Sequence, residues 1–356
     1  MKTPKKINKY RRKLMHKVTK GVGKSKGYST PAFIPKEDIK TVLISRPNHR
    51  LGNQLLITPL IQEVSEIFPN CKIDLFVKGG LAPILFKNYE NIDKIIQLPK
   101  KHFNNLIDYK NGWRFIKRKP YDLVINATKG SSSGRLSAKY ANSKYKIFGD
   151  EMEGLELKYK DSNHNAKRPV YNLREYMAEH GMTKINEKPM PLLDIKLSEA
   201  ELKNGHKILN GLIGKKGKTI CIFTYATGEK CYSEDWWLKF HDELKLKFKD
   251  CNIIEVLPVE NVSQILFKEP TFYSKDIREI GSLIANCDVF IGADGGIMHL
   301  SSAVHTPTIG LFSVTNIDIY EPYGNHSAGL KIDDNNQDEI ISAVSKVLQS
   351  DKTETV

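Results

Sequence analysis

A glycine turn between two short apolar segments is the feature that most constrains how this sequence folds. Residues 288–291 (Asp-Val-Phe-Ile) and residues 308–312 (Thr-Ile-Gly-Leu-Phe) are both apolar and rich in β-forming residues. The stretch between them, residues 293–306, has about the dozen or more residues that a helical crossover between parallel strands requires. The segment therefore predicts a strand, a glycine turn, a short helix and a second parallel strand.

The residues at this turn suit an anionic ligand. Gly295 and Gly296 allow the backbone to turn sharply and to approach a ligand without Cβ atoms in the way. The helix that follows directs its unpaired N–H groups and its dipole at the same position, which favours an anion such as phosphate. Asp294 can accept hydrogen bonds at the end of the strand, and His299 lies one turn into the helix. The turn is therefore a candidate phosphate site.

Taken as a whole, the string carries a family resemblance. From Asp294 to Phe312 it has the pattern Asp-x-Gly-x-Met-His-Leu-x-x-Ala-x-x-Thr-Pro-Thr-x-x-Leu-Phe. This pattern resembles the donor-site motif of the heptosyltransferase-like enzymes of glycosyltransferase family 9. The resemblance implies an α/β protein of the GT-B fold, in which two Rossmann-like, doubly wound parallel-sheet domains face a cleft. It also implies that the C-terminal domain holds a nucleotide-sugar.

Length and segment pattern agree with two such domains. The 356 residues suit two domains of about 150 residues each. We expect a basic tail at 1–35, an N-terminal acceptor domain at 36–190, a C-terminal nucleotide-sugar domain at 191–335, and a terminal helix and tail at 336–356. The expected strands are 41–45, 72–77, 92–98, 122–126, 218–224 and 253–257, besides the two already described. The expected helices are 53–68, 171–180, 201–213 and 338–348, with further helices opening at Ser233 and Asp276. Pro59 either kinks the first helix or begins a new one capped by Thr58.

The positive charge of the chain is concentrated at its N-terminus. The net charge is +14, but residues 1–26 contribute 11 lysines and arginines and no acid, so that only +3 remains for the rest. Ile7, Tyr10, Leu14, Met15 and Val18 fall at helical spacing within this tail. A basic amphipathic helix is typical of contact with an anionic membrane surface. A disordered basic arm and a nucleic-acid-binding arm are the alternatives.

Other features place the protein in the cytoplasm. No run of 18 or more apolar residues could span a bilayer, and the N-terminus lacks the apolar region of a secretory signal. The five cysteines show no Cys-x-x-Cys spacing, which favours reduced thiols. We therefore expect a cytoplasmic protein that is peripheral on the inner face of the cytoplasmic membrane.

A second motif resembles the first strand-to-helix turn of the same family. Residues 51–59, Leu-Gly-Asn-Gln-Leu-Leu-Ile-Thr-Pro, carry it, but Asn53 stands where the family usually has its catalytic aspartate. An amide cannot accept a proton usefully at neutral pH. His49, in the same loop, is the nearest alternative base because its intrinsic pKa suits neutral pH, although a loop histidine more often simply faces solvent. Asp122 and Glu151 are weaker candidates.

The resemblance also suggests the residues that hold the donor. Lys230 has the position of a family lysine that contacts the donor phosphates, with Thr224 or Thr227 supplying a hydroxyl beside it. Glu260 follows a strand at about the place of a family glutamate near the ribose. The expected donor-binding set is Thr224, Thr227, Lys230, Glu260, Asp294, Gly295, Gly296 and His299. Residues 131–135, Ser-Ser-Ser-Gly-Arg, form either an acceptor-binding loop or a plain polar turn, and residues 150–170 are expected to be a surface loop.

Together these features predict an inverting, metal-independent glycosyltransferase. The chain has no Asp-x-Asp motif to hold Mg²⁺ or Mn²⁺, so we expect no metal and no cofactor apart from the nucleotide-sugar, most simply an ADP-sugar. The expected reaction moves a heptose-like sugar to a lipopolysaccharide or surface-polysaccharide acceptor. Asn53 favours the alternative of a non-catalytic nucleotide-sugar-binding homologue. Only the tail favours a nucleic-acid-binding protein.

Overall fold

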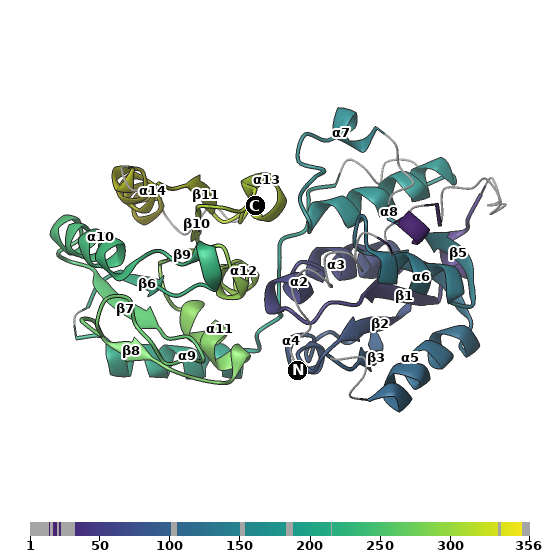
Figure 1. Ribbon diagram of the computed structural model, residues 1–356, viewed down its shortest axis with the longest axis horizontal. Helices are drawn as coiled ribbons and strands as arrows, with labels where there is room; N and C mark the ends of the chain where they lie inside the picture. The colour runs from purple at the N-terminus through teal and green to yellow at the C-terminus, as the bar shows by residue number, and fades with distance from the viewer. Residues whose placement is uncertain are drawn as a thin grey trace. The chain divides into compact units, whose positions relative to one another are not determined.

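The chain folds into two compact units, each built on one parallel sheet (Figure 1). The computed structural model describes residues 14, 17–19, 21–22, 33–100, 105–149, 154–182, 188–214, 216–333 and 336–350. The first unit holds the described residues up to His49 together with Ile57–Pro83 and Tyr89–Pro191. The second unit holds the described residues from Leu192 onward, and also Arg50–Leu56 and Ile84–Asn88 from the N-terminal half of the chain.

The first unit contains a five-stranded parallel sheet of order β3-β2-β1-β4-β5. Its strands are β1 (Thr41–Arg46), β2 (Lys72–Lys78), β3 (Ile92–Leu98), β4 (Tyr121–Asn126) and β5 (Ser143–Ile147). The central strands are nearly continuous apolar runs because helices cover both faces of a parallel sheet. The strand order reverses between β1 and β4, which is the switch point where such sheets bind ligands at their carboxyl ends.

The helices of the first half explain how Pro59 is accommodated. They are α2 (Leu51–Leu55), α3 (Thr58–Ile67), α4 (Ala82–Leu85), α5 (Leu106–Arg118), α6 (Ser132–Tyr140), α7 (Leu155–Lys158) and α8 (Lys167–Glu179), after a 3-10 turn η1 (Lys36–Asp38). Helix α2 ends at Leu55 and α3 begins at Thr58, so Pro59 occupies the first turn of α3. The backbone N–H that proline lacks would have no partner within the helix at that position. The prediction of a fresh start is confirmed, but Ile57 is the N-cap and Thr58 does not cap the helix.

Two segments expected to be loops are partly helical. Residues 131–135 form the start of α6, where the Ser131 side chain accepts a hydrogen bond from the Gly134 N–H. Within residues 150–170 the structure has α7 and the first turn of α8, which begins at Lys167 instead of Tyr171. The polar composition concealed this turn because, besides Pro169 and Val170, it buries Arg168, whose Nη1 lies 2.9 Å from Glu156 Oε1.

The second unit contains a six-stranded parallel sheet of order β11-β10-β9-β6-β7-β8. Its strands are β6 (Thr219–Phe223), β7 (Asn252–Val256), β8 (Thr271–Phe272), β9 (Val289–Ala293), β10 (Thr308–Phe312) and β11 (Ala328–Lys331). All neighbouring pairs are parallel, so the predicted α/β class with two doubly wound parallel sheets is confirmed. The sequence did not predict β5, β8 or β11.

The helices of the second half begin at recognisable capping residues. They are α9 (Glu199–Leu212), α10 (Glu234–Lys247), α11 (Ile277–Ile284), α12 (Gly296–Ala303), α13 (Ile317–Tyr320) and α14 (Gln337–Gln349), with a 3-10 turn η4 (Gly228–Lys230). The side chains of Ser233 and Asp276 cap α10 and α11, as predicted. Trp237, Phe240 and Leu244 of α10 are fully buried against the sheet, which holds α10 in place.

A buried arginine joins the short segment 84–88 to the second unit. Arg278, on α11, forms a bidentate ion pair with Glu201 of α9, with Nε–Oε1 and Nη2–Oε2 distances of 2.6 and 2.9 Å. Its Nη1 also donates to the carbonyl oxygens of Leu85 and Ile195, at 3.3 and 3.0 Å. With the Lys196 carbonyl oxygen, 3.0 Å from Nη2, these partners satisfy all five donors of a buried guanidinium, so the segment around Leu85 is part of the second unit's core.

Most of the N-terminal tail lies outside the described residues. Ile7, Tyr10 and Met15, three of the five apolar positions in the predicted helix, are among those not described. Leu14 and Val18 are exposed, whereas Thr19 is buried and its Oγ1 donates to Ser132 Oγ at 2.8 Å. In the part of the chain that the structure describes, no helix is long and apolar enough to cross a membrane.

Candidate functional site

The glycine turn of the second unit has the predicted form of strand, turn, helix and parallel strand. β9 leads through Asp294 and Gly295 into α12, and β10 pairs with β9 in parallel. Gly295 has an extended backbone (φ −171°) that any residue can adopt. Gly296 packs tightly, because a Cβ there would lie 3.0 Å from the Cβ of Leu51, closer than most side-chain contacts.

α2 packs closely against α12 through a second glycine. A Cβ on Gly52 would lie only 2.6 Å from Cδ2 of His299, so a larger residue would push the two helices apart. Both helices therefore begin side by side, with Arg50 immediately before α2 and Gly295 immediately before α12. This packing brings Arg50 to the same edge of the second sheet as the glycine turn.

A cavity of about 660 Å³ opens at this edge. It lies beyond the carboxyl ends of β6, β7 and β9, where open α/β sheets bind ligands. The polar lining side chains include Arg50, Thr227, Lys230, Glu260, Ser274, Lys275 and Asp294, and the apolar ones include Leu257, Val259, Ile277 and Ile280. Arg50, Lys230 and Asp294 thus line the side next to α12, and the loop after β7 and α11 form a more apolar side that also carries Glu260 and Lys275.

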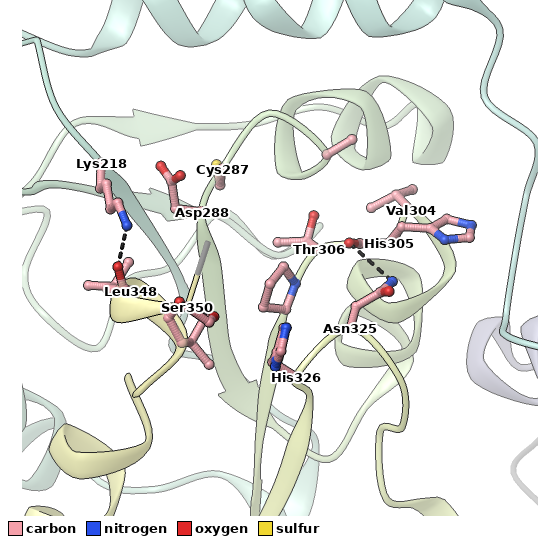
Figure 2. A pocket seen from close by; sticks show the side chains of 13 residues that line it. Lys218, Cys287, Asp288, Val304, His305, Thr306, Asn325, His326, Leu348 and Ser350 are labelled. Atoms are coloured by element: carbon pink, nitrogen blue, oxygen red, sulfur yellow. Dashed lines mark hydrogen bonds between the residues drawn. The ribbon is translucent and has the colours of Figure 1, made fainter. Parts of the chain in front are cut away.

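A smaller cavity, of about 270 Å³, lies at the opposite, amino edge of the same sheet (Figure 2). Its polar groups are used in structural hydrogen bonds. Asp288 Oδ2 accepts from the Thr219 N–H at 2.8 Å, and Lys218 Nζ donates to the carbonyl oxygen of Leu348. We therefore take the cavity at the carboxyl edge as the candidate functional site.

Six of the eight predicted donor-binding residues line this cavity, and Lys230, Asp294 and His299 form one cluster at it. Lys230, in η4, forms an ion pair with Asp294, whose carboxylate is 5% exposed. The other carboxylate oxygen of Asp294 lies 4.0 Å from Nε2 of His299. A buried carboxylate thus holds the lysine ammonium beside the N-terminus of α12, a position from which it can reach an anion.

The two candidate threonines have different surroundings. Thr227 lines the cavity. Thr224 is buried: its Oγ1 donates to Glu255 Oε1 at 2.6 Å and accepts the Gln264 N–H at 3.1 Å. Burial raises the pKa of the Glu255 carboxyl. Thr224 therefore supports the loop after β7 from inside, and Glu260 of that loop lines the cavity.

The predicted base candidates are spread over the molecule. Asn53 lies on α2, half-buried, and His49 is exposed in the first unit, next to Gly79. Asp122 is at the amino end of β4, away from the carboxyl edge of the sheet, and its Oδ2 accepts the Lys40 and Thr41 N–H groups, each at 2.9 Å. Glu151 lies outside the described residues.

Sequence reasoning missed several residues of the site. Arg50 and Lys275 add two cations to the cavity lining, and Tyr225 adds an aromatic ring. Tyr320, on α13, lies with its ring centroid 5.9 Å from Lys230 Nζ. The sequence offered one clue to Arg50, which directly precedes the motif at residues 51–59. Its place in the cavity, however, depends on α2 belonging to the second unit.

Comparison with known proteins agrees with the family resemblance. Residues 274–345, which include the glycine turn, match the model of Glycosyltransferase family 9 (heptosyltransferase). Lipopolysaccharide heptosyltransferase 3 of Escherichia coli strain K12 is 26% identical over 293 residues, covering 76% of this chain and 82% of that protein.

Solved structures show the same fold. A glycosyl transferase family 9 protein from Veillonella parvula is similar with a TM-score of 0.67 and 17% identity, covering 88% of this chain and 98% of its own. The E. coli heptosyltransferase WaaC with ADP is similar with a TM-score of 0.60 and 15% identity, covering 86% of this chain and 99% of its own. The predicted GT-B fold is therefore confirmed.

Proposed function

This chain is a glycosyltransferase of family 9, and we propose that the cavity of its second unit binds the nucleotide-sugar donor. The observation that carries the proposal is the Lys230–Asp294 ion pair at the N-terminus of α12. The diphosphate of a donor needs N–H donors and cations, and the start of α12, Lys230 and Arg50 can supply both. The apolar side of the cavity, at Leu257 and Ile277, suits a nucleobase.

The donor is proposed to be an ADP-linked, heptose-like sugar. Support comes from the relatives, since one is named a heptosyltransferase and another was solved with ADP. With the donor bound in this cavity, Glu260 and Thr227 would reach the ribose or the phosphates, and Asp294 would orient Lys230. Without an Asp-x-Asp motif, the charge that develops on the departing ADP would be stabilised by Lys230, Arg50 and the N–H groups at Gly295 and Gly296.

The reaction is proposed to be a single inverting displacement. An acceptor hydroxyl attacks the anomeric carbon of the sugar as the bond to the diphosphate oxygen breaks, and a general base takes the hydroxyl proton. The Asn53 amide cannot take that proton, and His49 is the proposed base. The proposed acceptor is a lipopolysaccharide, as the name of the E. coli relative suggests, or a surface polysaccharide. The proposed place of the reaction is the inner face of the cytoplasmic membrane.

Product analysis tests this function. The purified chain, incubated with ADP-heptose and a heptose-deficient lipopolysaccharide, is expected to release ADP and to extend the acceptor by one sugar. Donor binding with neither transfer nor hydrolysis, in the presence of a range of acceptors, would support the non-catalytic homologue that Asn53 favours.

Arg50→Ala is expected to weaken ADP binding by about tenfold to a hundredfold, because one charge-assisted hydrogen bond contributes about 1.5–3 kcal/mol. Arg50→Lys should retain part of the affinity. Adenosine, which has no phosphate, should bind both variants as it binds the unchanged protein. Isothermal titration calorimetry measures the affinity of the unchanged protein and of both variants for ADP and for adenosine. An equal loss for adenosine would mean that Arg50 shapes the cavity instead of binding the diphosphate.

The N-terminal tail is proposed to attach the protein to anionic lipid. Deleting residues 1–26 should strongly reduce co-sedimentation with anionic vesicles, because about 1 kcal/mol is gained for each Lys or Arg near such a surface. ADP affinity should be unchanged. High salt should weaken the full-length association, and neutral vesicles should bind poorly. If the truncated chain sediments as well as the intact one, the tail is only a basic arm.

A further inference from the structure

The outer face of α5 combines exposed aliphatic side chains with exposed cations. Leu106 and Ile107, in its first turn, are 60% and 73% exposed. Lys110 and Arg114 follow them at spacings of three, four, seven and eight residues, Lys117 and Arg118 lie three and four residues beyond Arg114, and all four are exposed. We call this set the α5 surface: Leu106, Ile107, Lys110, Arg114, Lys117 and Arg118.

The opposite face of α5 fixes this orientation. Ile116 is fully buried in the core of the first unit, and Tyr109 and Trp113 pack against that core. The Trp113 ring meets Phe76 edge-on, with centroids 5.3 Å apart. A Cβ on Gly112 would lie 2.8 Å from Cδ2 of Leu98, so the helix lies close against β3 (Figure 1). The α5 surface therefore faces outward because the inner face is held by packing.

The charge of this face is strongly positive. Asp108 is the one acidic residue of α5, and its backbone N–H is capped by Asn105 at 3.2 Å. Beside the helix, Lys117 Nζ lies 4.6 Å from the ring centroid of Tyr140 on α6, and Lys139 Nζ lies 5.7 Å from the same ring. Tyr140 is 46% exposed, so an amphipathic ring and a further cation extend the surface.

We propose that the α5 surface docks on an anionic lipid bilayer. Four cations complement anionic headgroups, and their long alkyl stems can lie along the acyl boundary. Leu106 and Ile107 distinguish a bilayer from a nucleic acid, because an exposed aliphatic pair gains free energy on entering hydrocarbon but little against a phosphate backbone. Tyr140 is of the residue type that gathers at membrane interfaces.

The described residues of the N-terminal tail contact the first unit beside α5 and α6. Val22 packs against the core cluster that Tyr109 and Trp113 also cover, and Thr19 is hydrogen-bonded to Ser132 at the start of α6. Val18 and Leu14, four and eight residues before Val22 in the sequence, are exposed. The folded surface proposed here therefore adjoins the tail. It does not depend on the donor site of the second unit.

Co-sedimentation of the full-length chain with vesicles of phosphatidylglycerol and phosphatidylethanolamine tests the inference. Lys110→Gln combined with Arg114→Gln should lower the partition coefficient at least tenfold, since each cation contributes about fivefold. Leu106→Ser combined with Ile107→Ser should lower it several-fold, and this loss should persist at high salt. ADP affinity and the thermal midpoint should stay unchanged in both variants.

A matched control variant distinguishes binding through the α5 surface from a general effect of the protein's positive charge. Lys203→Gln combined with Lys207→Gln removes two exposed cations from α9 of the other unit and should change partitioning less than twofold. Equal losses in the control and the α5 charge variant would overturn the proposal, as would an unaffected serine variant. Tighter binding to duplex DNA than to the vesicles, lost in the α5 charge variant, would assign the surface to nucleic acid and also overturn it.

Discussion

Asp294→Ala is expected to reduce ADP affinity by about tenfold to a hundredfold, although Asp294 carries the same sign of charge as the ligand. Asp294 holds the Lys230 ammonium beside the N-terminus of α12. Without the carboxylate, the lysine loses the partner that places it, and a charge-assisted hydrogen bond of about 1.5–3 kcal/mol is lost with that placement. Lys230→Ala should cost a similar factor.

A double-mutant cycle read by calorimetry distinguishes positioning from simple charge. If the two residues act as a pair, the double variant should lose little more affinity than either single variant, because each change already removes the shared arrangement. Additive losses would mean that Asp294 and Lys230 contact the ligand independently. Unchanged ADP affinity in both single variants would refute the site. Lys275→Ala, at the same cavity, serves as a control for the removal of one cation.

His49→Ala is expected to lower kcat by about a hundredfold or more, which is the usual contribution of a general base. The fall of kcat on the acidic limb of the pH–rate profile should also disappear, because that limb reports protonation of the base. Donor affinity should be unaffected, since His49 is exposed in the first unit. Initial rates of ADP release, measured between pH 5 and pH 9 with saturating acceptor, provide the test.

Asn53→Asp is the companion experiment. It restores the carboxylate that the family usually has at this position, so activity should be kept or raised. His49→Ala should then cost less when it is combined with Asn53→Asp than when it is made alone. Asn53→Ala is the control for any contribution of the amide itself. An active enzyme in which His49→Ala is silent would exclude His49 as the base.

Most of the fold prediction rested on local sequence features such as apolar runs and capping residues. β10 was placed at its observed bounds because an apolar run is closed by Pro307 on one side and by a polar loop on the other. The starts of α10 and α11 followed from capping residues. By contrast α5 was missed, although Tyr109, Gly112, Trp113 and Ile116 show helical spacing, because its many polar residues obscured that pattern. β8 has two residues and leaves almost no signal.

The site was less accessible to sequence reasoning because it depends on contacts between distant segments. Lys230 and Asp294 were identified by resemblance, and the structure joins them. Thr224 could not be separated from Thr227 without knowing that Glu255 lies beneath it. Arg50 could not be assigned to the cavity because the residues that flank segment 50–56, His49 and Ile57, belong to the first unit.

The contribution of α2 and residues 84–88 to the second unit has a practical consequence for dissecting the protein. A gene fragment beginning at Leu192 would encode all six strands of the second sheet, yet it would omit Leu51 and Gly52, which pack on α12. It would also leave Arg278 without the carbonyl of Leu85. A donor-binding fragment therefore requires residues 50–56 and 84–88 to be grafted or supplied in trans, because the second unit is discontinuous in sequence.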